Sequence, residues 1–132
     1  MNRLYPKWKQ ELLQGSVNTS LTGTVNALLI DTGAYTYSDV HQFLTDVPGG
    51  ARVGAALTLS SKTFALGVFD AADLNFVAVT GPTVEAMILY ISTGADATSR
   101  LVGFIDSAIN LPFTPSGIDQ PVLFDPQGLF GL

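Results

Sequence analysis

The chain has 132 residues, no cysteine, a net charge of −5, and only 13% charged residues against 47% hydrophobic ones. This length provides for one hydrophobic core, and the missing cysteines exclude disulfides, zinc–thiolate sites and a thiol nucleophile. The charged fraction is about half of the ~25% that is usual in soluble domains. Because so few charges cannot coat an isolated globule well, we expect other chains to cover part of the apolar surface.

The charges are unevenly distributed along the sequence. Arg3, Lys7 and Lys9 are three of the six basic residues, whereas all eleven acids lie from Glu11 onward. An acidic body without a basic stripe disfavours nucleic acid as a partner. The uncharged stretch 12–30 is interrupted by many polar residues, which excludes a transmembrane helix and predicts a soluble chain with no membrane partner.

The first predicted elements are a helix and a central strand. Pro6 suits the first turn of a helix over residues 4–14, Trp8 falls on its apolar face, and Gly15 is a typical stop. The strand in "TGTVNALLIDT" ends in the run 28–30, which is apolar on both faces. This pattern predicts a strand that is covered on both sides.

The stretch "YTYSDVHQFLTDVPGG" interrupts the β pattern. Ser38 can cap a short helix near residues 38–46 that turns Val40 and Phe43 inward and stops at Pro48. His41, the single histidine, is interpreted as a surface residue of this helix. A catalytic triad needs a nucleophile on a strained turn, and no G-x-S-x-G sequence is present.

Short strands separated by turns follow from residue 51 onward. Their spacing and their β-branched and aromatic residues predict a mainly β fold, an antiparallel β-sandwich or barrel formed by a single domain over residues 1–132. The predicted strands are "ARVGAALTL", "KTFALGVF", "LNFVAVT", "TVEAMILYIS", "RLVGFID" and "QPVLF". The predicted core residues are Leu29, Phe76, Val77, Ile88, Tyr90, Leu101 and Phe104.

Two arginines open predicted strands in an acidic body. Arg52 and Arg100 are therefore expected to be structural charges, each meeting a carboxylate or a set of carbonyls. The strand "RLVGFID" after Arg100 is apolar on both faces, so it must be covered on both by a helix, a second sheet or another subunit.

No arrangement of residues points to catalysis, a cofactor or a metal. "DVPGGARVG" lacks the lysine and the preceding strand of a phosphate-binding loop, and the spacing of an EF-hand calcium loop is absent. The aspartates lie where strands meet turns, where they commonly bind backbone amides. These are Asp70, Asp73, Asp96, Asp106, Asp119 and Asp125. We expect no enzyme activity, no cofactor and no metal site.

Several sequence blocks together resemble a family of small virion structural proteins of tailed bacteriophages. They run in order over nearly the whole chain: "LYPKWKQELLQG", "ALLIDTGAYTYSDVHQFLTDVPGGARV", "GVFDAADLNFVAV", "VEAMILYISTGADATSRLVGFIDSAINLPFTPSG" and "LFDPQG". The resemblance implies a β-rich component of the phage particle, located in the virion and made in the bacterial host cytoplasm. The ending "VLFDPQGLFGL" is more apolar than the Trp-containing, lysine-bearing ending of that family.

The resemblance and the composition favour a capsid decoration or cement protein. Its partners would be other virion proteins, such as the major capsid protein or neck and tail proteins, and copies of itself in a homo-oligomer. One alternative is a neck, tail or baseplate component such as a fibre-attachment module. Another is a carbohydrate-binding or hydrolytic sandwich that uses Trp8, Tyr35, Tyr37 and the strand-end aspartates.

Candidate interface residues lie at both ends of the chain. Tyr5 and Trp8 are candidates because aromatic residues are enriched at interface cores. The ending "GLFGL" adds Leu129, Phe130 and Leu132, and it can be ordered as a last strand of its own sheet or in a groove of an adjacent subunit. Because its glycines weaken an intrinsic strand, we favour contact with another chain for Phe130 and Leu132.

Overall fold

The computed structural model describes residues 2–132, and most of its regular structure is β. The strands are β1 (Arg3–Leu4), β2 (Val25–Ile30), β3 (Arg52–Thr58), β4 (Val68–Phe69), β5 (Leu74–Phe76), β6 (Ala86–Ile91), β7 (Arg100–Ile105), β8 (Gln120–Val122) and β9 (Phe130–Gly131). The α-helix is α1 (Pro6–Leu13), and single 3-10 turns occupy Leu44–Asp46, Gly49–Ala51 and Ala65–Gly67. No helix within residues 2–132 is long and apolar enough to cross a membrane.

A five-stranded antiparallel sheet forms the centre of the molecule. Its order is β1-β7-β6-β2-β3, with Ile88 of β6 opposite both Leu28 of β2 and Phe104 of β7. Strand β6 is central because all six of its residues are apolar and need cover on both faces. The register of β3 against β2 shifts opposite Leu28, near Gly54, whose positive φ of 71° suits a glycine.

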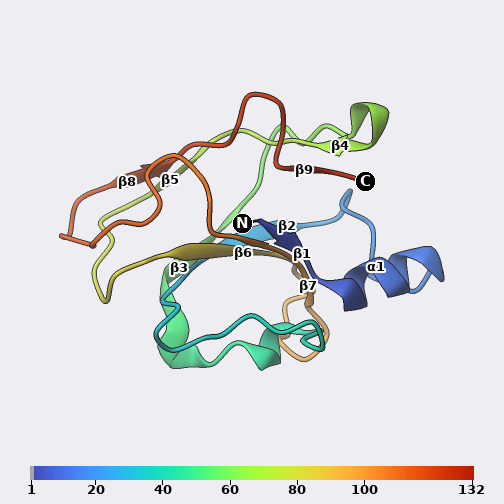
Figure 1. The fold of residues 1–132 in the computed structure, drawn as a ribbon, viewed down its shortest axis with the longest axis horizontal. Helices are drawn as coiled ribbons and strands as arrows, with labels where there is room; N and C mark the ends of the chain where they lie inside the picture. Colours follow the sequence, from blue (N-terminus) through green and yellow to red (C-terminus); the bar gives the residue numbers. More distant parts are fainter. Residues whose placement is uncertain (1) are drawn as a thin grey trace.

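Different parts of the chain cover the two faces of this sheet (Figure 1). The pairs β4–β9 and β5–β8 form a second layer on one side, and residues 31–51 lie on the other. On that second side, the Phe104 ring packs 5.6 Å from Tyr37 and 6.3 Å from Tyr35, measured between ring centroids. The result is a sandwich-like arrangement with an open sheet, which confirms the predicted mainly β, antiparallel class.

The helix predictions were correct in place but not in detail. Helix α1 lies within the expected range 4–14 but begins at Pro6, because Leu4 belongs to β1, and the helix expected near residues 38–46 is only the 3-10 turn Leu44–Asp46. Asp46 accepts the amides of residues 42 and 43, and the Leu44 amide donates to Ser99, which holds the segment extended beside β7. Val40 is consequently exposed rather than turned inward.

The predicted core is confirmed for six of its residues and wrong for Val77. Leu29, Phe76, Ile88, Tyr90, Leu101 and Phe104 are buried. Val77 is 70% exposed because β5 ends at Phe76, and Ala78 turns the chain with a φ of 48°. The predicted strand "KTFALGVF" is likewise reduced to β4, since Leu66 and Gly67 both have positive φ values.

Candidate docking surface

The aromatic residues at the start of the chain belong to the core. Tyr5 and Trp8 are 0% and 2% exposed, so their prediction as interface residues is wrong for this conformation. The Trp8 indole donates to the Thr19 carbonyl at 2.9 Å, and the Tyr5 hydroxyl lies 2.8 Å from that of Tyr35. Each polar tip is satisfied within the chain, which allows these amphipathic side chains to be buried.

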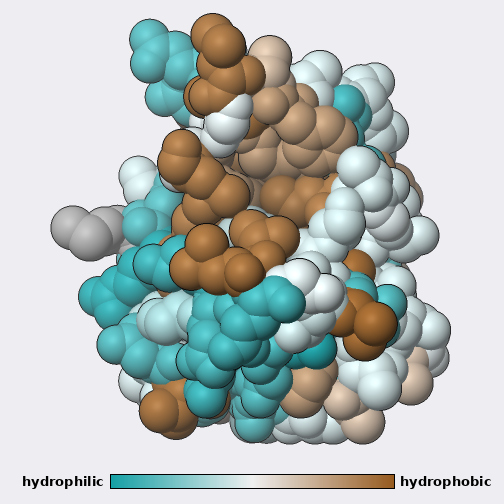
Figure 2. All heavy atoms as spheres, turned by 90° about the vertical axis from the view of Figure 1, so that its right-hand side faces the viewer, coloured by the Kyte–Doolittle hydropathy of each residue, from teal (hydrophilic) through white to brown (hydrophobic). Residues whose placement is uncertain are grey.

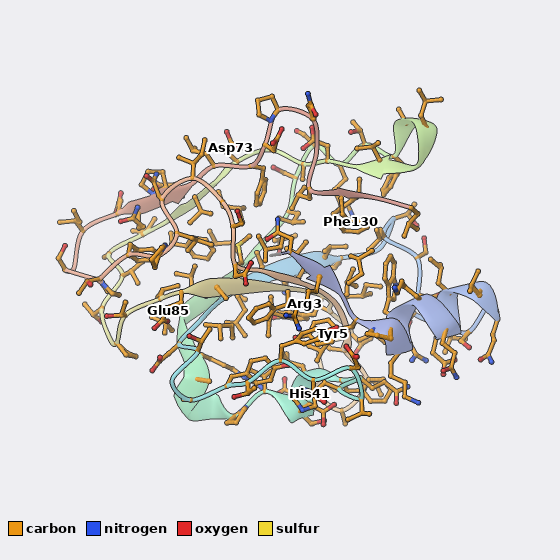
Figure 3. The ribbon with its side chains drawn as sticks, viewed as in Figure 1. Arg3, Tyr5, His41, Asp73, Glu85 and Phe130 are labelled. Carbon is orange, nitrogen blue, oxygen red and sulfur yellow. The ribbon has the colours of Figure 1, made fainter. Side chains whose placement is uncertain are left out.

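A chain of hydrogen bonds connects Tyr5 to His41 beneath the sheet (Figure 3). The Tyr35 hydroxyl lies 2.7 Å from His41 Nδ1, and the two rings pack at 5.3 Å. His41 is thus half-buried in a turn rather than exposed on a helix. Burial raises the pKa of Tyr5 far above its ordinary value, and the hydrogen bond that it shares with Tyr35 raises it further. Because Trp8 and Tyr35 are buried, they do not form an exposed platform for a sugar.

Arg52 satisfies the expectation for a structural charge. Its Nη1 pairs with Asp96 at 2.9 Å, and its Nε and Nη2 donate to the Val47 carbonyl at 3.2 and 2.9 Å. Nη2 also donates to the Leu44 carbonyl at 2.8 Å. One guanidinium therefore ties the segment on the second face of the sheet to the start of β3.

Arg100 is held differently and meets fewer partners. Its Nε donates to the Val17 carbonyl at 3.0 Å, and its guanidinium carbon lies 5.2 Å from the centre of the Phe43 ring. Its Nη1 is buried without a hydrogen-bond partner among residues 2–132. The side chain is packed on its own chain as expected, with a carbonyl and a ring in place of the expected carboxylate or set of carbonyls.

The strand-end aspartates bind backbone amides. Asp73 accepts the Phe124 amide at 2.8 Å, and Asp119 accepts the Ala78 amide at 2.9 Å. Asp70 and Asp125 accept amides within their own turns, and Asp96 pairs with Arg52. Within residues 2–132, no group of three acidic or histidine side chains is arranged to hold a metal ion.

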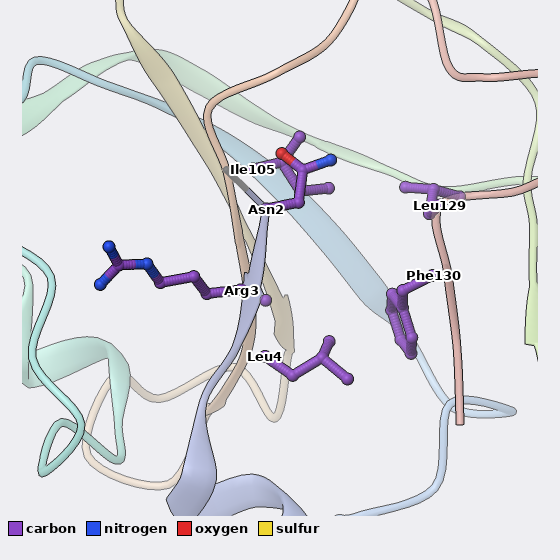
Figure 4. Close-up of a pocket in the computed structure, with 7 residues that line it drawn as sticks. Asn2, Arg3, Leu4, Ile105, Leu129 and Phe130 are labelled. Atoms are coloured by element: carbon purple, nitrogen blue, oxygen red, sulfur yellow. The ribbon is translucent and has the colours of Figure 1, made fainter.

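The C-terminal segment forms a strand of its own chain. Strand β9 pairs with β4, and the Phe130 ring packs 5.9 Å from Trp8 and 5.3 Å from Phe69. Leu129 is buried and lines a small cavity of about 50 Å³ with Leu4 and Phe130 (Figure 4). Phe130 is therefore ordered as part of a strand of its own chain, and its contact with another chain stays a prediction. Leu132 is 69% exposed, and its interface role stays a prediction.

An apolar face surrounds Leu132 at this end of the molecule (Figure 2). Two hollows of about 120 and 180 Å³ lie next to each other and share three of their lining residues. Trp8, Phe69 and Phe130 line the hollows from the core side. We define the apolar face by Leu12, Leu21, Phe64, Leu66 and Leu132.

Leu66 is the most unusual residue of the apolar face. It lies at the centre of the turn Ala65–Gly67 with a φ of 55°, and its side chain is fully exposed. A left-handed conformation costs a residue with a Cβ roughly 1–2 kcal/mol, and glycine or asparagine usually occupies it. Sequence reasoning missed this residue because "TFALGVF" has the apolar composition of a strand.

Neither a scan of protein-family models nor a search of curated proteins found a match to this chain. The phage resemblance therefore stays a prediction. The apolar face is the structural feature from which a function can be argued.

Proposed function

We propose that the protein is a structural component of a tailed-phage virion, made in the host cytoplasm, and that it decorates the capsid and stabilises its shell. The apolar face carries this proposal. A strained turn that displays a fully exposed leucine beside two apolar hollows gains nothing in an isolated chain. It gains stability when a neighbouring subunit buries the leucine. A particle supplies such neighbours as the major capsid protein and further copies of this chain.

The rest of the molecule supports a binding rather than a catalytic role. Both faces of the sheet are covered by the chain itself, so the ends of the molecule are left for partners. The aspartates that would be candidate acids and bases accept amide hydrogen bonds that fix turns. The sequence resemblance points to a phage particle and is independent of the apolar face.

The proposal is tested by locating the chain in purified particles of its phage. We expect quantitative mass spectrometry to give a copy number comparable to that of the major capsid protein, and a reconstruction to show density on the shell. A few copies at the portal end would assign the chain to the neck, tail or baseplate instead. Absence from purified particles would overturn the virion proposal.

A rebinding assay tests the apolar face itself. We expect Leu66→Asp to weaken binding to particles that lack the protein at least about tenfold, because it places a charge in a desolvated contact. Val40→Asp is the matched control, since Val40 is also exposed but lies on the segment over the opposite face of the sheet. Equal binding by both variants would show that the apolar face has no role in docking.

A further inference from the structure

We infer that the apolar face receives the β5–β8 end of a second copy, so that copies of this chain associate head to tail. This inference deepens the proposed function by naming the partner of the apolar face. The β5–β8 end presents two exposed aliphatic side chains, Val77 at 70% and Ile118 at 66% exposure. Their segments lie side by side, because the Val79 amide donates to the Ile118 carbonyl and the Gly117 amide to the Val79 carbonyl.

Backbone strain occurs at both ends. Ala78 has a φ of 48° beside exposed Val77, as Leu66 has a φ of 55° in the apolar face. Among the other non-glycine residues within 2–132, those with a positive φ are Asn18, Ser61 and Asn110. Asparagine tolerates this conformation well, whereas leucine and alanine gain nothing local from it. The strain at Ala78 and Leu66 thus coincides with displayed apolar side chains.

The two surfaces lie at opposite ends of the longest axis of the molecule (Figure 1). The turn Ala65–Gly67, the tip of α1 and β9 lie at one end, and the segments around β5 and β8 lie at the other. One molecule cannot therefore bring its own two surfaces together. Contact between unlike surfaces of identical chains is heterologous, and it repeats into a ring or a filament.

The charges of the two ends are complementary. Lys7 and Lys9 outnumber Glu11 on α1, and Lys62 donates to the carbonyls of Leu21 and Gly23 next to the apolar face. The β5–β8 end is acidic, because its segments 74–85 and 110–122 contain two acidic residues and no lysine or arginine. It carries Asp119, with Glu85 on the same side of the molecule (Figure 3). Opposite charges favour this orientation, and they disfavour contact between two like ends.

The two ends also match in shape, because each hollow at one end can receive one apolar side chain from the other. The apolar face offers two adjoining hollows, and the β5–β8 end offers two projecting aliphatic side chains. Leu66 precedes Gly67, which lines one of these hollows, and its fully exposed side chain adds a third apolar group to this end. A second copy therefore provides apolar contacts at the centre and lysine–carboxylate pairs at the rim.

The test uses three variants of the full chain in analytical ultracentrifugation over a concentration series. We expect the unmodified protein and the Val40→Asp control to associate with increasing concentration. Leu66→Asp and Ile118→Asp should each weaken self-association at least tenfold. A mixture of these two variants should form one-to-one complexes and nothing larger, because each supplies the surface that the other has lost. Added salt should weaken association of the unmodified protein.

Other outcomes overturn the inference in distinguishable ways. Normal self-association of Ile118→Asp together with failure of Leu66→Asp would mean that the apolar face pairs with itself about a two-fold axis. If the unmodified protein stays monomeric over the whole concentration series, a second copy is excluded as the partner of the apolar face. The particle-binding assay would still decide the proposed function, because it needs no self-association. Circular dichroism should be unchanged in all variants, since the substituted side chains are exposed, and no unfolding midpoint should fall, because aspartate tolerates the positive φ of residue 66 better than leucine does.

Discussion

Charged side chains in this protein mainly hold the backbone of their own chain. Asp46 binds two amides before its turn, Asp73 binds the Phe124 amide, and Arg52 gathers two carbonyls. The local roles of aspartate could be predicted from sequence, because aspartate commonly binds amides a few residues away. The partners of Arg52 could not be predicted in detail, because Asp96 is brought to it only by the tertiary fold.

Replacing Arg52 by methionine is expected to destabilise the fold by about 1–3 kcal/mol, because the Val47 carbonyl loses the guanidinium donors and the Leu44 carbonyl keeps only the Val47 amide. Methionine keeps much of the apolar stem, so the loss reports the hydrogen bonds. Asp96→Asn is the control and should cost about 0–1 kcal/mol, since Asp96 is half exposed. Urea unfolding measures both values. Equal losses of unfolding free energy in the two variants would mean that the Arg52–Asp96 ion pair, rather than the carbonyl contacts, stabilises the fold.

The free energy of unfolding is expected to fall as the pH rises above about 10. Burial raises the pKa of Tyr5, and burial with Asp39 raises that of Tyr37 to about 12. Below pH ~10 both phenols are protonated in the folded and unfolded states, whereas above it the unfolded chain loses these protons first. Ionisation therefore stabilises the unfolded state at high pH.

Tyr5→Phe and Tyr37→Phe should each flatten this pH profile, because both phenols ionise in the unfolded chain at a lower pH than in the folded one. The readout is the slope of the unfolding free energy between pH 9 and pH 11, roughly one pH unit on each side of the ordinary phenol pKa. Loss of the Tyr5 hydrogen bond shifts the whole profile and does not change its slope. A Tyr5→Phe profile parallel to that of the unmodified protein would contradict the prediction.

Whole elements were predicted where apolar patterning was unambiguous. The central strands β2, β6 and β7 follow from continuous apolar runs, and α1 follows from Pro6 and helical spacing. Elements of two or three residues, such as β4 and β9, were not predictable because long-range pairing determines them. The apolar face was missed for the same reason, since its turn and its C-terminal residue are joined only by that pairing.

Gly128→Ala is expected to detach β9 from β4. A Cβ at this position would lie 2.5 Å from Val68 Cγ1 and 3.1 Å from the Phe69 carbonyl oxygen, and φ is +117°. Gly131→Ala is the matched control, because its Cβ would meet neighbours only at 3.8 Å. Hydrogen exchange at the Leu132 amide, which donates to Gly67, should become fast in Gly128→Ala only. Trp8 fluorescence should change in parallel, since Phe130 packs against that ring.

The layered arrangement of the whole molecule could be predicted better from its composition than from any sequence motif. Low charge and continuous apolar strands predict a sheet covered on both sides, and the structure provides this cover from residues 31–51 and from the second layer. The location of the exposed apolar side chains on the molecule could not be predicted, because it depends on which turns adopt positive φ values. The turns at Leu66 and Ala78 determine where these side chains are displayed, and each of the two residues has a positive φ that its residue type disfavours.

The closing of the sheet edge has a consequence for synthesis on the ribosome. Arg3 pairs with Phe104, and Trp8 packs against Phe130, so residues translated early wait for partners translated late. Until then Trp8 lacks the ring that covers it, and such exposed aromatic surface is open to chaperones and proteases. A prematurely terminated chain would keep that surface exposed and would be removed. Only chains translated through β9 would then complete the fold.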